Sequence, residues 1–240
     1  MDELPGEVAR ALAPWFERAR RDLPWRRTRN PYEIWVSEVM LQQTRVDTVE
    51  VYYPAFLERF PTVEALAAAD EDEVVGAWSG LGYYRRARFL HRGARFVAEK
   101  LGGRIPEAAE DLRTIPGIGP YTAGAISSFA FDRPSALVDG NVARVLSRLR
   151  AETDPKRQVA TARAHWTTTQ AILEQGSPRV LGNALMELGA TVCTPRNPSC
   201  DECPVRSSCR AHAEGLQGEI PAPKKRKASV QPAPEGIQRL

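Results

Sequence analysis

Four cysteines lie within seventeen residues near the C-terminal end of the chain, and it contains no others. Their spacing, C-x6-C-x2-C-x5-C, with prolines between them, lets four thiolates converge on one point. Four thiolates are the ligand set of structural zinc sites and of iron–sulfur clusters. Two disulfides would use the same residues, but nothing in the sequence indicates the oxidising compartment that they need. The loop therefore predicts a metal centre held by Cys193, Cys200, Cys203 and Cys209.

Two carboxylates could perform acid and electrostatic chemistry. Glu38 stands among apolar residues such as Val36 and Val39, and partial desolvation would raise its pKa. Asp139 precedes the apolar stripe of a helix expected at 141–150, where the helix dipole favours an ionised carboxylate. Two carboxylates whose pKa values are shifted apart by their environments are typical of a catalytic acid with an ionised partner. By local pattern alone, a plain N-cap is the better explanation of Asp139, and the spacing does not exclude a surface glutamate at Glu38.

A third motif is the segment LRTIPGIGPYTA at 112–123, which reads as helix, tight turn and helix. Gly117 and Gly119 permit positive φ and leave backbone N–H groups unobstructed in front of a helix N-terminus. Such a turn can hold one phosphate of a nucleic acid without reading its sequence. We expect Gly117, Gly119, Tyr121 and Thr122 to bind phosphate, and a mere connection between helices is the alternative.

The elements that must position these groups are helical, because no alternating β-branched run is long enough to demand a sheet. An amphipathic helix beginning after Pro31 carries Glu38. Asp70 to Glu73 opens another helix with a capping box, and a helix at 184–190 leads into the cysteine loop.

The 240 residues are 42% hydrophobic and 26% charged, which is ordinary for a globular protein, and the net charge is +3. No signal peptide and no run approaching the ~18 apolar residues of a membrane span are visible. We therefore expect a protein of the bacterial cytosol without membrane contact, in which thiols stay reduced. Arginines beside aromatic residues, as at 83–88, suit phosphate contact, although each cluster could be a solvated helix face.

Together these motifs resemble the endonuclease III and MutY family of DNA glycosylases, and within it the adenine-removing members. The resemblance runs from Leu23-Pro24-Trp25-Arg26 to Cys209 and includes the segments 37–44, 80–84 and 138–142. It implies an all-α, two-lobed helix-hairpin-helix fold. It also implies one 4Fe–4S cluster, with zinc as the alternative. The implied domains are a six-helix barrel at 27–135, an iron–sulfur domain at 1–26 and 136–211, and a flexible linker or tail at 212–240.

The resemblance further implies a monomeric, monofunctional glycosylase of base excision repair, which acts on double-stranded DNA containing adenine opposite 8-oxoguanine or guanine. Glu38 would protonate adenine N7 and help activate water, and Asp139 would stabilise or trap the sugar cation. Tyr121 would support that intermediate, and Asn141 would position the catalytic groups. Base binding and insertion into the base stack would fall to Trp25, Arg26, Leu41, Gln42, Gln43, Val46, Tyr83 and Asn183.

Tyr121 also separates this chain from bifunctional relatives, which carry a lysine there for a Schiff base. A thymine glycosylase for G/T mismatches is one alternative function; it would not need the acid at Glu38. A non-catalytic iron–sulfur DNA-binding protein is the other, and two intact carboxylates argue against it. The cysteine loop would present a basic surface to DNA rather than perform chemistry, through Arg196, Arg206 and Arg210.

Two features depart from the family pattern. Its members usually continue into a C-terminal domain that helps recognise 8-oxoguanine, whereas this chain stops at Leu240. The sequence therefore predicts adenine removal without predicting a preference for 8-oxoguanine over guanine. Asn183 replaces the Glu or Gln that many relatives carry near the adenine edge, and its shorter reach alters that contact.

Overall fold

The computed structural model describes residues 3–154 and 158–221, and these ranges contain helices and turns but no strand. The helices are α1 (Leu4–Ala19), α2 (Pro24–Arg27), α3 (Pro31–Leu41), α4 (Val46–Arg59), α5 (Val63–Ala68), α6 (Glu71–Ala77), α7 (Arg85–Lys100), α8 (Ala109–Leu112), α9 (Pro120–Phe131), α10 (Gly140–Leu149), α11 (Gln158–Leu173), α12 (Pro178–Thr191), the 3₁₀ turns η2 (Cys200–Glu202) and η3 (Arg206–Ser208), and α13 (Arg210–Ala213). The all-α class predicted from the sequence is confirmed. None of these helices is long and apolar enough to cross a membrane.

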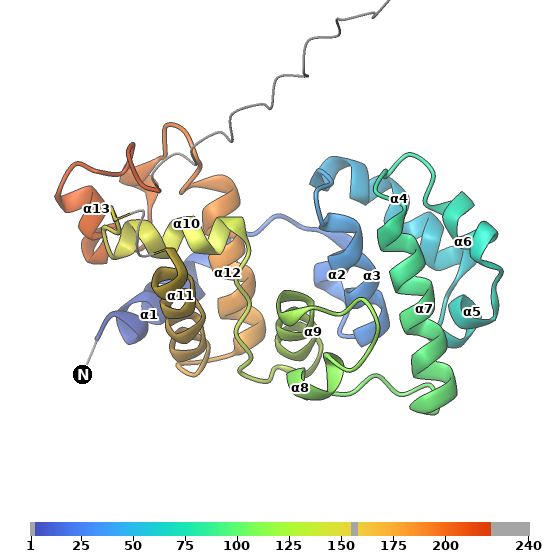
Figure 1. Ribbon diagram of the computed structural model, residues 1–240. Coiled ribbons are helices and arrows are strands. Elements are labelled where there is room, and N and C mark those ends of the chain that lie inside the picture. The colour runs from blue at the N-terminus through green and yellow to red at the C-terminus, as the bar shows by residue number, and fades with distance from the viewer. Residues whose placement is uncertain (1–2, 155–157, 222–240) are drawn as a thin grey trace, which may run out of the picture.

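Figure 1 shows two groups of helices side by side. Helices α2 to α7 form one group, whereas α1 joins α10 to α13 in the other, so the N-terminal helix packs with the C-terminal part. Helix α9 lies between the groups and packs against both α3 and α12. The domain boundaries expected at residues 27 and 135 stay a prediction.

Helix α3 lies in the centre of its group, against α4, α7 and α9. Eight of its eleven residues are buried, Glu38 among them. The predicted amphipathic pattern is therefore wrong, because neighbouring helices cover almost the whole circumference of α3. The helix ends at Leu41, so the Gln-Gln-Thr segment at 42–44 forms a turn beyond it.

The predicted helix starts are confirmed at two caps. Asp70 forms a capping box with Glu73 at the start of α6. Asp139 is the N-cap of α10. The helix expected at 184–190 begins earlier, at Pro178, with Ser177 as its cap. The first backbone N–H groups of a helix have no partner within the helix, and a side chain at most three residues away accepts their hydrogen bonds. Because this interaction is local, helix starts of this kind can be predicted from the sequence.

The hairpin predicted at 112–123 is present as α8, a tight turn and α9. Gly117 has φ +88°, and a Cβ there would lie 2.8 Å from Cβ of Phe89, so the turn requires glycine. Gly119 has φ −89° and open space around its Cβ position, so positive φ is needed at Gly117 alone.

The first ten residues of the expected flexible tail, 212–221, are packed against the rest of the protein. Ile220 is 2% exposed, and its carbonyl accepts a hydrogen bond of 2.8 Å from Nε of Arg148. Residues 212–221 therefore pack against the C-terminal group, because an apolar side chain and a buried guanidinium hold them there. The remainder of the expected tail, 222–240, lies outside the described residues.

Candidate functional site

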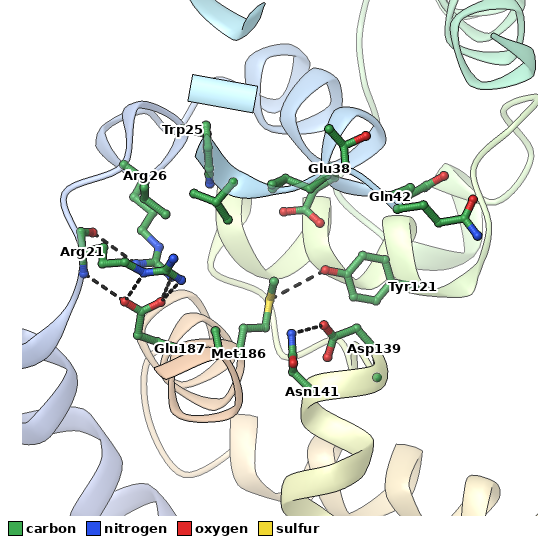
Figure 2. A pocket seen from close by; sticks show the side chains of 17 residues that line it. Arg21, Trp25, Arg26, Glu38, Gln42, Tyr121, Asp139, Asn141, Met186 and Glu187 are labelled. Carbon is green, nitrogen blue, oxygen red and sulfur yellow. Dashed lines mark hydrogen bonds and ion pairs between the residues drawn. The ribbon is translucent and has the colours of Figure 1, made fainter. Parts of the chain in front are cut away.

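A cavity of about 460 Å³ lies where the two groups of helices meet. Its walls come from the α1–α2 connection, the end of α3, and the N-termini of α9 and α10, and α12 closes it. Figure 2 shows the carboxylates of Glu38, Asp139 and Glu187 around this one space. Ten residues proposed from the sequence line it: Trp25, Arg26, Glu38, Leu41, Gln42, Gln43, Val46, Tyr121, Asp139 and Asn141.

Glu38 projects from the buried helix α3 and is 3% exposed. Burial raises the pKa of Glu38 to about 7; the Asp139 carboxylate adds to the rise, and the Tyr121 phenol and Arg26 oppose it. Among the described residues, Oε2 of Glu38 is buried without a hydrogen-bond partner. A carboxyl with this pKa holds a proton near neutral pH and has a free oxygen for a ligand.

Asp139 faces Glu38 from the first turn of α10. Its Oδ1 accepts a 2.7 Å hydrogen bond from the backbone N–H of Val142, and Nδ2 of Asn141 donates to Oδ2 at 3.0 Å. These donors and the helix N-terminus all favour a negative charge at this position. Asn141 is oriented in turn, because its Oδ1 accepts a 2.8 Å bond from Nη2 of Arg144.

Tyr121 stands between the two carboxylates, in the first turn of α9. Burial raises the pKa of its phenol well above the usual value, and both carboxylates add to the effect. The hydroxyl therefore stays protonated, and it makes a weak contact of 3.7 Å with the sulfur of Met186.

Glu187, on α12, is the third carboxylate of the cavity and is completely buried. It accepts bonds of 2.9 and 2.7 Å from Nε and Nη2 of Arg21, 3.0 Å from the Arg21 backbone N–H, and 2.8 Å from Nη2 of Arg26. These arginine bonds outweigh desolvation and lower the pKa of Glu187 to about 2. Asn183 does not reach this cavity; its Oδ1 accepts a 3.3 Å bond from Nε of Arg26, which it helps to hold.

Gln43 and Tyr83 are exposed, and both are in the left-handed region, with φ of 59° and 48°. Tyr83 is 61% exposed and lies outside the cavity lining, and its insertion into the base stack stays a prediction. Non-glycine residues in this region are strained and need support from their surroundings.

That support is the guanidinium of Arg86, which is buried between the two segments. It stacks within 5.6 Å of the centroid of the Tyr83 ring. Its hydrogen bonds go to the carbonyls of Val39, Met40, Gln42, Leu81 and Gly82 and to the hydroxyl of Thr44. Arg86 was expected to contact phosphate or solvent, and the structure contradicts this, because carbonyls at a helix end and at a turn converge on it.

The proposed phosphate site divides into exposed and buried parts. Gly117 and Gly119 are exposed on the hairpin turn. Thr122 is 2% exposed, and its hydroxyl accepts a 3.4 Å bond from Nε2 of Gln42, so its side chain is unsuited to phosphate. The Tyr121 side chain likewise points into the cavity, which leaves the turn backbone as the phosphate-facing part.

The four cysteines line one small enclosed space together with Arg148, Arg206 and His212. Arg148 donates to the Cys193 sulfur at 3.3 Å and to the Thr194 carbonyl at 2.7 Å. Burial, with the other thiols adding to it, raises the pKa of Cys203 to about 11. Within the described ranges, no group of three or more His, Cys, Asp or Glu side chains is placed to hold a single metal ion. Four soft donors around one space, with cations beside them, fit a multi-iron cluster with its negative charge.

The basic surface expected on this loop is partly neutralised. Arg206 pairs with Asp201 at 2.9 Å and Arg210 with Glu214 at 3.3 Å. Arg196 forms no ion pair among the described residues.

The cysteine loop also contacts the helix that carries Asn141. Nε of Arg144 donates to the Cys193 carbonyl at 2.8 Å, and its Nη2 donates to the Gly189 carbonyl at 2.7 Å. A Cβ on Gly189 would lie 2.6 Å from Cβ of Asn141, so glycine allows α12 to approach α10 here.

Sequence reasoning missed several residues of this site: Arg21, Met186 and Glu187 in the cavity, Arg86 beneath the turns, and Arg144 and Arg148 beside the loop. Glu187 lies five residues after a glycine in an apolar helix, and a charged residue in such a run is a signal of a buried ion pair. The others show no distinctive sequence pattern.

Comparison with known proteins gives consistent matches. Residues 36–169 match the family model of the HhH-GPD superfamily base excision DNA repair protein, and 193–209 match the iron–sulfur binding domain of endonuclease III. The adenine DNA glycosylase of Rattus norvegicus is 48% identical over 223 residues, which cover 89% of this chain and 43% of the rat protein. That of Mycolicibacterium smegmatis is 43% identical, over 85% of this chain and 69% of its own length. The solved structure of a thermostable thymine-DNA glycosylase superposes with a TM-score of 0.79 at 27% identity, over 89% of this chain and 100% of that one.

These matches decide between the metals left open by the spacing. The cysteine loop matches an iron–sulfur binding domain over its whole length, from Cys193 to Cys209. The four cysteines therefore hold a 4Fe–4S cluster rather than zinc. The chain spans less than half the length of the rat relative.

Proposed function

The chain belongs to the HhH-GPD superfamily of base excision DNA repair proteins, and within it to the adenine DNA glycosylases; on this premise we propose that it removes mispaired adenine from duplex DNA. The reaction is hydrolysis of the N-glycosidic bond of adenine opposite 8-oxoguanine or guanine, and it leaves an abasic site. The observation that carries the proposal is the pair of carboxylates in one cavity: Glu38, whose pKa burial raises to about 7, and Asp139, which accepts hydrogen bonds from Asn141 and Val142.

The proposed chemistry follows from these environments. Adenine must leave the base stack and enter the cavity, because its glycosidic bond is inaccessible inside a duplex. Glu38 donates its proton to a ring nitrogen, so the protonated base accepts the electrons of the breaking bond and leaves as neutral adenine. The ionised Asp139 stabilises the oxocarbenium-like sugar that remains. Water then adds to C1′ and returns its proton to the Glu38 carboxylate, which restores the starting state.

Three further residues have supporting roles in this proposal. Tyr121 has no amine to form a Schiff base, so the strand is not cut, and its protonated hydroxyl can donate to the Glu38 carboxylate that forms when Glu38 gives up its proton. Asn141 orients Asp139 through the 3.0 Å bond, and Arg26 lines the cavity as a fixed cation. The 4Fe–4S cluster supplies a cross-link that shapes the loop; hydrolysis transfers no electrons.

Thymine removal from G/T mismatches is the second candidate, because a thymine-DNA glycosylase shares the fold. Thymine is a pyrimidine without an N7 and leaves as an anion, so an acid placed to protonate a purine ring nitrogen is not needed. The raised pKa of Glu38 therefore favours adenine. Binding of double-stranded DNA with a mispaired adenine is part of the proposal. The monomeric state, the location in the bacterial cytosol and the opposite-base preference stay predictions.

The test is single-turnover base release with Asp139→Asn, using duplexes with A opposite 8-oxoguanine, A opposite G, and T opposite G. Asparagine keeps the N-cap of α10 but lacks the charge. We expect adenine release to fall about 10²–10³-fold, the usual cost of losing transition-state charge stabilisation, while duplex binding persists. Asp47→Asn, an exposed carboxylate outside the cavity, is the matched control.

Unchanged adenine release by Asp139→Asn would remove the proposed mechanism. Thymine release by the unaltered protein would transfer the assignment to the mismatch enzyme. No release from any duplex, with binding intact, would leave a DNA-binding role.

A further inference from the structure

The outer face of α7 carries four exposed arginines, Arg85, Arg88, Arg92 and Arg95. Two are neutralised: Arg88 pairs with Glu71 at 3.1 Å, and Arg95 pairs with Glu99 at 3.5 Å. Arg85 and Arg92 form no ion pair with any residue in the described part of the chain. One helix therefore presents two compensated and two uncompensated guanidinium groups.

The two uncompensated groups share an aromatic support. The guanidinium carbons of Arg85 and Arg92 lie 5.0 and 4.5 Å from the centroid of the Phe89 ring. Attraction of this kind between a guanidinium and an aromatic ring restricts the side-chain rotamers. Both charges are therefore held at one aromatic ring, and a guanidinium has several N–H groups with which to bind an anion.

Phe89 places these charges beside the hairpin turn. Its Cβ and carbonyl are the atoms nearest to the Gly117 Cβ position, and both residues line one small cavity with Gln42. The exposed turn backbone at Gly117 and Gly119 adjoins this part of α7. The surface thus continues from the expected phosphate site of the hairpin onto the helix.

We propose that Arg85, Phe89 and Arg92 form a second phosphate-binding surface, the α7 patch, which holds the DNA backbone next to the hairpin contact. The proposal rests on the proposed function for the choice of DNA as partner. Planar guanidinium groups bind phosphate oxygens through paired N–H bonds, and such contacts position a duplex without reading its sequence. Continuity with the hairpin favours the same nucleic-acid strand over an acidic protein.

Salt dependence of DNA binding tests the α7 patch. The probe is an undamaged duplex of about 25 base pairs, and the dissociation constant is measured by fluorescence anisotropy between 50 and 200 mM NaCl. Each phosphate contact contributes about 0.9 to the slope of log K against log [NaCl]. We expect Arg92→Gln to lower the slope by about 0.9, so its affinity deficit is about 3.5-fold larger at 50 mM than at 200 mM.

Matched controls on the same helix separate contact from net charge. Arg95→Gln and Arg88→Gln remove the same charge from groups that are already paired, and we expect slopes near that of the unaltered protein. In the double variant Arg85→Gln/Arg92→Gln, the slope of log K against log [NaCl] should be smaller by about 1.8. Equal slope changes in Arg92→Gln and Arg95→Gln would overturn the patch, as would no change in either.

Base release keeps this test separate from the proposed function. At saturating enzyme and low salt, the control variant Arg95→Gln should release adenine at the rate of the unaltered protein, because Arg95 is already paired with Glu99 and lies outside the cavity. If the unaltered protein releases adenine but Arg92→Gln has the same salt slope, the α7 patch is refuted and the proposed function stands. If Arg92→Gln lowers the slope but the unaltered protein releases no adenine, the proposed function is refuted and the α7 patch stands.

Discussion

Two walls of the same cavity each contain a fully buried glutamate, and the two glutamates have opposite properties. Glu38, on α3, has an oxygen with no partner in the described structure and a pKa raised to about 7. Glu187, on α12, accepts four hydrogen bonds from Arg21 and Arg26 and has a pKa lowered to about 2. Both are desolvated, so burial alone does not distinguish them.

The difference lies in the hydrogen-bond donors that each carboxylate meets. Donors stabilise the ionised form and turn Glu187 into a structural anchor between the α1–α2 connection and α12. Burial of Glu38 outweighs the Tyr121 phenol and the Arg26 charge, so Glu38 holds its proton near neutral pH, which is a cost to stability and an advantage for acid catalysis. We therefore assign chemistry to the carboxylate that is poorly satisfied, and positioning to the one that is well satisfied.

The largest expected effect comes from Glu38→Gln. Glutamine keeps the shape of the side chain but cannot donate an acidic proton, so single-turnover adenine release should fall about 10³-fold, within the range for general acids. Glu33→Gln, on the same helix and away from the cavity, is the control. If Glu38→Gln released adenine at more than a tenth of the normal rate, Glu38 would not be the catalytic acid, and the two glutamates would not differ in function as we propose.

Glu187→Gln should act on stability instead. Removing the charge leaves Arg26 buried without its counter-ion, and the free energy of unfolding should fall by about 3 kcal/mol. For a chain of this size, that is a decrease in Tm of about 6–12 °C, measurable by circular dichroism. Base release at 20 °C should fall much less than in Glu38→Gln. If Glu187→Gln lost activity while its Tm stayed unchanged, Glu187 would be a catalytic group rather than a structural anchor.

The smallest effect is a pH dependence that belongs to Glu38 alone. Only protonated Glu38 can act as the acid, so the single-turnover rate should be about tenfold lower at pH 8 than at pH 6. Glu187 does not titrate in this range, because its pKa is about 2. The Glu38→Gln variant should show no such decline, and an identical decline in that variant would exclude Glu38 as its source.

Stability should show the same titration with a definite sign. Folded Glu38 binds its proton more tightly than unfolded Glu38, whose pKa is 4.5, so stability decreases as pH rises from 4.5 to about 7. The decrease reaches about 3 kcal/mol above pH 7. Glu38→Gln should remove it, which makes the inactive variant the more stable one at pH 8.

Much of the fold and part of the site were legible in the sequence. The capping box at Asp70, the N-cap at Asp139 and the positive φ of Gly117 depend on groups within about four residues of each other. The cysteine spacing is equally local, and it indicated a metal loop before any helix was placed. Resemblance then supplied the lobes and the residues of the cavity, ten of which lie together.

Other properties depend on contacts between distant segments. Arg21 and Glu187 are 166 positions apart, and Arg86 collects carbonyls more than forty positions away. The amphipathic pattern expected for α3 was wrong for the same reason, because helices remote in sequence cover its other side.

By itself, the sequence determined the helical elements, their caps, the hairpin turn and the thiolate set, because hydrogen bonds and steric limits between near neighbours specify them. Only the tertiary structure decided which carboxylate keeps its proton, which arginines are buried, and which guanidinium groups of α7 are free. These properties are set by desolvation and by donors brought together from distant segments, and a linear pattern does not contain either.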